Sequence, residues 1–104
     1  MAQENIRDIS LLRAEIDRID RELVALFAAR MQVSAEVAAY KKHIGMAVTD
    51  TTREAALLAR VEDLSPAEIR NYTNTLYQTI LSLSRAYQRA KLEGDAPAPK
   101  SEEK

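Results

Sequence analysis

The chain of 104 residues is long enough for one domain and lies near the lower limit for a chain that builds a core alone. Its 46% hydrophobic and 30% charged residues are typical of globular proteins rather than disordered ones. Two glycines and three prolines are too few for the frequent turns of an all-β domain. The composition therefore favours a single all-helical domain.

The composition also excludes several kinds of chemistry. There is no cysteine, which excludes disulfides, zinc–thiolate sites, iron–sulfur clusters and thiol nucleophiles. The single histidine, His43, argues against a histidine-based metal site and a Ser-His-Asp triad, so we expect no metal. A net charge of −1 argues against nucleic-acid or anionic-membrane partners. With a polar N-terminus and no uninterrupted apolar run of about 18 residues, we expect a cytoplasmic protein without a membrane partner.

The first expected element is a long helix from about Ile6 to Lys42. Apolar residues recur at steps of three and four from Ile9 to Val37, and neither glycine nor proline occurs before Gly45. About 37 helical residues would span roughly 55 Å, whereas a compact globule of this chain length has a diameter of about 33 Å. A helix longer than its own domain needs another surface for its apolar stripe, so we expect a homodimer.

A short second helix is expected after Gly45, which is suited to end the first helix. Either Asp50 or Thr51 can cap the second helix, and Thr51 with Glu54 has the spacing of a capping box. This helix is expected to run to about Glu62.

The third expected helix begins at Ser65 and runs to about Leu92. Ser65 is predicted as its N-cap, with Pro66 at the first helical position and Glu68 three residues after the cap. Residues 1–92 are thus predicted to form an all-α domain of three helices per chain (long, short, long) in an intertwined homodimer. Residues 93–104 have almost no apolar content and are predicted to form a disordered tail.

Two cations interrupt the apolar stripe of the first helix. Arg30 and Lys41 occupy positions at which the stripe predicts an apolar residue, and because they lie 11 positions apart both face the same side of the helix. Because an unpaired buried cation is costly, each must pair with a carboxylate or face an anionic ligand. One interpretation is structural, with Arg30 in an ion pair and Lys41 extending into solvent. The other is an anion-binding pocket between helices.

Three further polar residues are candidates for a site. Arg13 lies about 25 Å from Arg30 along the same helix, but antiparallel pairing of two copies would bring it near the partner's Arg30 region. Ser84 and Gln88 are one turn apart and share a face beside the apolar stripe of the third helix. Arg13 as a solvated residue, and Ser84 with Gln88 as a structural pair, are the alternatives.

Together these residues match a family pattern. The chain resembles the all-helical chorismate mutases, the AroQ type, over about residues 8–92, through Leu12-Arg13-x-x-Ile16-Asp17, Ala29-Arg30, Lys41, Asp50-x-x-Arg53-Glu54 and Ser84-x-x-x-Gln88. The resemblance implies a stand-alone enzyme that converts chorismate to prephenate in phenylalanine and tyrosine biosynthesis. It also implies a dimer whose long first helices pair antiparallel.

The resemblance assigns substrate-binding roles to several residues. The equivalent of Arg13 reaches into the site of the partner subunit. The equivalents of Arg30, Lys41 and Arg53 supply positive charge to the two carboxylates of the substrate, and the equivalent of Ser84 helps with one carboxylate.

Further roles concern the ring hydroxyl and the breaking bond. The equivalents of Asp50 and Glu54 hold the ring hydroxyl, Asp50 through its backbone. Lys41 and Gln88 match the donors to the ether oxygen, so the resemblance makes these two, with Arg30, the catalytic residues.

The chemistry that the resemblance implies is consistent with the composition. An intramolecular [3,3] rearrangement breaks a C–O bond while a C–C bond forms, and it needs no nucleophile, no proton transfer, no metal and no cofactor. It needs restraint of a flexible dianion in a chair-like conformer. It also needs positive charge and N–H donors at an ether oxygen that gains negative charge.

Three other functions remain open. An isochorismate pyruvate lyase on the same fold is disfavoured by Asp50-x-x-Arg53-Glu54, which matches the mutase pattern. A 4-amino-4-deoxychorismate mutase would use almost the same residues. A non-catalytic helical dimer module is the alternative from a different class.

Overall fold

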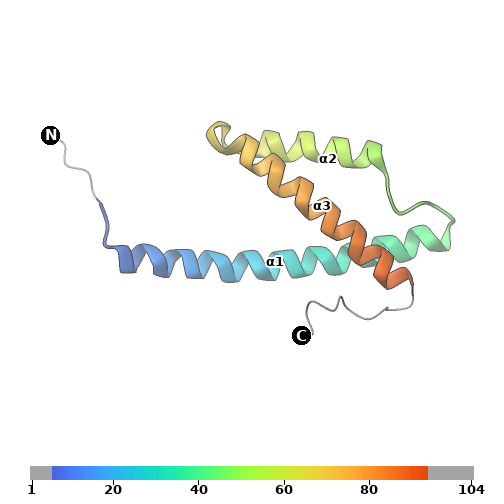
Figure 1. Ribbon diagram of the computed structural model, residues 1–104, viewed down its shortest axis with the longest axis horizontal. Coiled ribbons are helices and arrows are strands. Elements are labelled where there is room, and N and C mark those ends of the chain that lie inside the picture. Colours follow the sequence, from blue (N-terminus) through green and yellow to red (C-terminus); the bar gives the residue numbers. More distant parts are fainter. Residues whose placement is uncertain (1–5, 94–104) are drawn as a thin grey trace. The chain divides into compact units, whose positions relative to one another are not determined.

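The computed structural model describes residues 6–93, which form three α-helices and one short 3₁₀ helix (Figure 1). Within this range there is no strand, so the predicted all-α class is confirmed for the described residues. The elements, in chain order, are α1 (Ile9–His43), α2 (Thr51–Leu64), η1 (Ala67–Ile69) and α3 (Arg70–Leu92). The predicted tail begins at Glu93, which ends α3, and the rest of that tail lies outside the described residues.

The chain divides into two compact units, Met1–Gln32 and Val33–Lys104. The first unit contains the larger part of α1. The second contains the remaining turns of α1 together with α2 and α3.

The helix of the first unit begins at Ile9, three residues after the predicted start near Ile6. The Asp8 carbonyl accepts the N–H groups of Leu11 and Leu12, both at 3.1 Å, and its carboxylate accepts the Ser10 N–H at 3.0 Å. Hydrogen bonds from the Ser10 hydroxyl and then from its N–H lower the pKa of the Asp8 carboxyl below its ordinary value. The helix starts after Asp8 because that residue satisfies the first free N–H groups.

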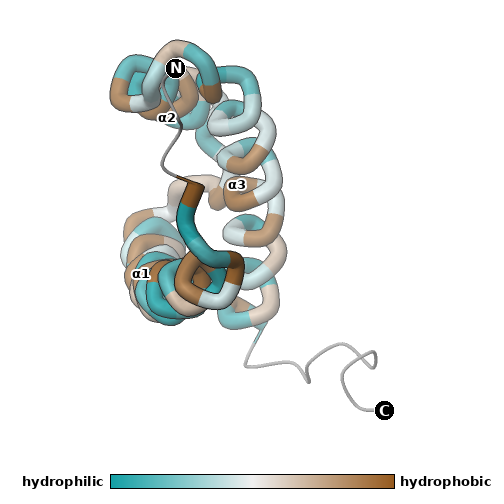
Figure 2. Tube along the Cα trace, turned by 90° about the vertical axis from the view of Figure 1, so that its left-hand side faces the viewer, coloured by the Kyte–Doolittle hydropathy of each residue, from teal (hydrophilic) through white to brown (hydrophobic). Residues whose placement is uncertain are grey.

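Apolar side chains of the first unit face solvent, and none of its described residues is buried. Figure 2 shows hydrophobic residues recurring along α1. The exposed ones that follow the helical period are Ile9, Ile16, Ile19, Leu23 and Leu26. One helix cannot bury its own apolar face, so the predicted dimer interface along this stripe stays a prediction.

By length and composition, α1 is long and apolar enough to cross a membrane. This is weak evidence, because a helix that packs inside a soluble protein meets the same criterion. Charged residues recur along α1, and Arg30 and Glu36 interrupt even its most apolar part. Charged side chains are costly inside a bilayer, so these charges argue against a membrane-spanning role for α1. The absence of a membrane partner stays a prediction.

In the second unit, α1 ends at His43, and Gly45 follows it in the predicted helix-ending role. Gly45 has a positive φ of 78°, and its N–H donates to the Lys42 carbonyl at 3.2 Å. The Met46 N–H donates to the Lys41 carbonyl at 2.7 Å. This pair of bonds is the Schellman motif, in which a left-handed residue lets the chain satisfy the last helical carbonyls.

Asp50 is the cap of α2, which answers the choice left open between Asp50 and Thr51. Its carboxylate accepts the Arg53 N–H at 3.0 Å. The predicted capping box does not form, because the Glu54 carboxylate bonds Arg85 of α3 instead. α2 continues to Leu64, beyond the predicted end.

The predicted start of the third helix at Ser65 is wrong. Ser65 ends α2: its N–H donates to the Glu62 carbonyl at 3.1 Å and its hydroxyl shares a hydrogen bond of 2.7 Å with Thr73. The chain then forms η1, and α3 begins only at Arg70, whose Nε donates to the Glu62 carbonyl at 3.0 Å. The Ser65 hydroxyl, which would have capped a helix starting there, is therefore bonded to Thr73 of α3 instead.

The core of the second unit lies between α2 and α3, which form a helical hairpin (Figure 1). Leu57 and Val61 of α2 are buried against Leu81 of α3, with Leu58 and Tyr77 packed beside them. The packing of this hairpin fixes α3 relative to α2. It thereby positions the polar residues at the start of α2 and in the later turns of α3, such as Glu54 and Arg85.

Candidate active site

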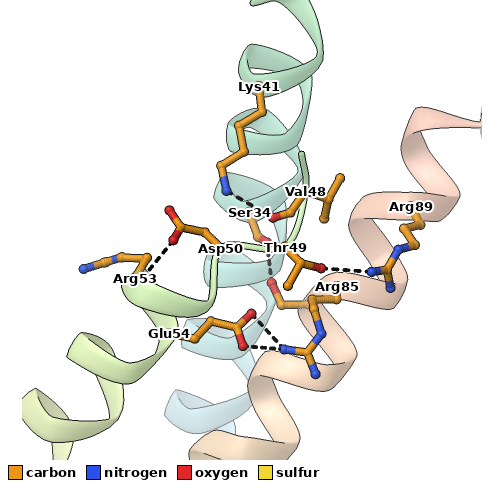
Figure 3. Close-up of polar contacts among 10 residues, drawn as sticks. Ser34, Lys41, Val48, Thr49, Asp50, Arg53, Glu54, Arg85 and Arg89 are labelled. Atoms are coloured by element: carbon orange, nitrogen blue, oxygen red, sulfur yellow. Dashed lines mark hydrogen bonds and ion pairs between the residues drawn. The ribbon is translucent and has the colours of Figure 1, made fainter. Parts of the chain in front are cut away.

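Most of the predicted site residues lie in the second unit, where the end of α1, the start of α2 and the later turns of α3 meet (Figure 3). They are Lys41, Asp50, Arg53, Glu54, Ser84 and Gln88. The other two belong to the first unit, in which Arg13 is exposed and Arg30 is half-buried.

Lys41 is half-buried and points back to the loop that follows α1 (Figure 3). Its Nζ donates to the Val48 carbonyl at 3.1 Å. The side chain therefore does not extend into solvent from the helix end, which was the structural alternative. An ammonium has three N–H donors, so the bond to Val48 leaves donors that a ligand can use.

Ser84 and Gln88 are buried, and both bond Ser34 of α1. The Gln88 Nε2 donates to the Ser34 carbonyl at 2.8 Å, and the Ser34 and Ser84 hydroxyls are hydrogen-bonded to each other. The exposed fractions are 9% for Ser34, 6% for Ser84 and 7% for Gln88. These bonds join α1 to α3, as the structural alternative expects. The Gln88 amide still carries a second N–H, so a structural bond and a ligand bond are compatible.

Sequence reasoning did not single out Ser34. It stands four residues after Arg30, as a small polar residue in a helix whose stripe is otherwise apolar. A polar residue at that position could have indicated a buried hydrogen bond. The bonds of Ser34 to α3 explain why a polar residue is stable there.

Glu54 and Arg85 form an ion pair between α2 and α3 (Figure 3). The Arg85 Nη1 lies 2.7 Å from both Glu54 oxygens, and 29% of the Arg85 side chain and 24% of the Glu54 side chain are exposed. Arg85 was also missed in the sequence. Nothing local marks it, because its partner is 31 residues away.

Asp50 and Arg53 lie at the first turn of α2. The Asp50 carboxylate accepts the Arg53 N–H through Oδ1, and the Asp50 carbonyl accepts the Glu54 N–H at 3.0 Å. The Arg53 side chain is exposed and extends away from Glu54 (Figure 3). On the other side, the Arg89 Nη2 donates to the Thr49 hydroxyl at 3.0 Å and ties the loop before α2 to α3.

The charges of this group suit an anionic ligand. Lys41, Arg53 and Arg85 are cations, whereas Asp50 and Glu54 are the carboxylates, so positive charge is in excess. Arginine forks match carboxylates bidentately, and a lysine supplies a compact charge to a single acceptor atom. Among residues 6–93 there is no group of three or more histidine, aspartate and glutamate side chains that could hold a metal ion.

Comparison with known proteins agrees with this picture. Residues 12–89 match the family model described as chorismate mutase type II, and the chain therefore belongs to that family. It is 27% identical over 90 residues to the chorismate mutase of Methanocaldococcus jannaschii, an alignment that covers 85% of this chain and 91% of the relative. The resemblance found in the sequence is thus confirmed.

A second relative is the T-protein of Haemophilus influenzae, which is 43% identical over 47 residues. That alignment covers 45% of this chain but only 12% of the T-protein, so the chain corresponds to a small part of that protein's length. No solved structure matches the chain.

Proposed function

We propose that the chain catalyses the rearrangement of chorismate to prephenate, in the biosynthesis of phenylalanine and tyrosine in the cytoplasm. The observation that carries this proposal is the family match over residues 12–89, which contains every predicted site residue. The grouping of Lys41, Glu54, Ser84 and Gln88 in the second unit supports it.

Binding of the substrate dianion falls to the cations. Arg30 and Arg53 pair with the two carboxylates, together with Arg13 of the second copy, and Ser84 adds a hydroxyl donor. These contacts hold the flexible substrate in the folded conformer in which the reacting carbons approach. The half-buried state of Arg30 in the first unit supports its role, because a partly desolvated guanidinium binds a carboxylate strongly.

Rate acceleration falls to Lys41 and Gln88. Both donate N–H groups to the ether oxygen, which gains negative charge as the C–O bond breaks. The bond from Lys41 to the Val48 carbonyl and the bond from Gln88 to the Ser34 carbonyl support this role. Side chains held in place before the substrate binds need little reorganisation during the reaction.

The active form is a homodimer in which the α1 helices of two copies pair. The exposed apolar stripe of the first unit, with Leu26 69% exposed, supports a large apolar interface. A second copy is the simplest partner, because a two-fold interface uses the same stripe on both chains. Antiparallel pairing would bring Arg13 of one copy to the site of the other.

Activity is tested by following the loss of chorismate and the appearance of prephenate with the purified chain. Lys41→Ala should lower kcat at least about a hundredfold, because one donor to the developing charge is removed. The matched control is Lys42→Ala, since the neighbouring ammonium lies 3.4 Å from the Leu92 carbonyl and has no role in the site. Near-normal kcat in Lys41→Ala would remove Lys41 from the mechanism, and an inactive wild-type chain would reject the proposed function.

A further inference from the structure

The ion pair between Glu54 and Arg85 links α2 to α3 in addition to the apolar core of the hairpin. The core between α2 and α3 is apolar and lies at Leu57, Val61 and Leu81. Arg85 follows the buried Ser84 directly in α3 and directs its guanidinium to Glu54, whose role in the proposed function is to hold the ring hydroxyl (Figure 3). The Arg85 guanidinium therefore contacts the Glu54 carboxylate, the group that would bind the ring hydroxyl of the substrate.

The geometry of the pair leaves Glu54 able to accept a further donor. Both carboxylate oxygens are bonded by the same nitrogen, Nη1, at 2.7 Å. A carboxylate oxygen has two lone pairs, so each Glu54 oxygen keeps one for a ligand. Glu54 is thus held in one orientation by Arg85 and remains a hydrogen-bond acceptor.

The charge of the pair differs from that of an isolated glutamate. A carboxylate alone attracts both a neutral hydroxyl and a cationic ammonium, and it attracts the ammonium more strongly. With the Arg85 guanidinium bound, the two charges cancel, and the guanidinium repels a second cation nearby. A neutral hydroxyl is insensitive to that repulsion and needs only the acceptor oxygen.

We propose that Arg85 is a specificity-determining positioning residue, which makes the Glu54 end of the site select a neutral ring hydroxyl over a protonated ring amine. This inference rests on the proposed function, because it assigns Glu54 to the ring substituent of the substrate. It also separates two substrates that the sequence pattern left open, chorismate and 4-amino-4-deoxychorismate. The amine of the second compound resembles an alkylamine, which is protonated at neutral pH.

The test measures kcat/KM for both compounds with the wild-type chain and with Arg85→Met and Arg85→Gln, which remove the guanidinium charge. Each variant should shift the ratio of the two kcat/KM values toward the amino compound by at least about tenfold, as expected when a like-charge contact is removed. Arg85→Lys restores a cation beside Glu54 and should restore the preference for chorismate. Arg60→Met is the matched control, because Arg60 is an exposed arginine of α2.

The ratio distinguishes this role from a purely structural one. If Arg85 only fastened α2 to α3, its loss would lower both kcat/KM values and the melting temperature together and leave the ratio unchanged. An unchanged ratio in both Arg85→Met and Arg85→Gln, or an equal shift in Arg60→Met, overturns the inference. If the wild-type chain turns over chorismate but the Arg85 variants keep the wild-type ratio of kcat/KM values, this inference alone is refuted. If the wild-type chain is inactive on both compounds, the proposed function is refuted and the inference with it.

Discussion

Gln88 is a neutral donor in a buried position, and this affects how activity should depend on pH. The residue is 7% exposed and its amide Nε2 donates to the Ser34 carbonyl, so the orientation of the amide is fixed. An amide does not titrate, so its N–H is present at every physiological pH. With no proton transfer required by the rearrangement, kcat of the wild-type chain should be nearly constant between about pH 6 and 8.

Gln88→Glu should make activity dependent on pH. A glutamate donates only when protonated, so kcat should rise as the pH falls and decline as the carboxyl ionises. At neutral pH the loss should be at least about a hundredfold, because an ionised carboxylate lacks the donor and repels the charge that develops on the ether oxygen. The measurement is kcat from about pH 5 to 8 in a series of constant ionic strength.

The control for this substitution is Gln78→Glu, which adds the same charge to an exposed position of α3. It should leave the profile flat. A loss in Gln88→Glu that is the same at every pH would contradict a donor role for Gln88.

The end of α1 is set by a short-range signal, the glycine at position 45. Its φ of 78° lies in the left-handed region that most residues avoid, and a Cβ there would meet no atom within 4 Å. Gly45→Ala should therefore destabilise the fold through backbone strain alone, by about 1 kcal/mol. Unfolding in urea with an unchanged m-value is the measurement.

Gly45→Asn provides the comparison, because asparagine tolerates the left-handed conformation better than alanine. The expected order of stability is glycine, asparagine, alanine. Equal stability of all three chains would show that the strain at residue 45 is relieved by a change in the loop.

Assembly governs whether the site is complete, since the proposed function takes Arg13 from the second copy. The exposed stripe of the first unit, which includes Ile16 and Leu23 at 55% exposure each, is the surface that would form the interface. A chain with that stripe uncovered would lack both a stable partner for α1 and one cation of the site.

Mixing two inactive variants tests this sharing of residues. Arg13→Ala and Arg30→Ala chains should each be inactive alone, but a mixed dimer would keep one site with both arginines intact. Random exchange of equal amounts should restore about a quarter of wild-type activity, because half of the dimers are mixed and each has one intact site. Sedimentation should show that the mass remains that of a dimer. Absence of recovery after proven exchange of subunits would contradict shared sites.

The order and class of the elements could be predicted from the chain alone. The period of apolar residues in α1, the glycine at its end and the aspartate cap of α2 act within one or two helical turns, so a reader of the sequence can see both partners of each interaction. The pattern of polar residues was likewise specific enough to identify the family, because their types and spacings are linear information.

Contacts between distant segments could not be read in this way. Ser65 looks like a helix start, yet its hydroxyl bonds Thr73 and its N–H ends α2. Ser34 and Arg85 gave little or no signal, since their partners lie 50 and 31 residues away. Which side chains meet there depends on how α2 and α3 pack, and packing is decided by the summed burial of Leu57, Val61, Leu81 and their neighbours, which no short stretch of sequence contains.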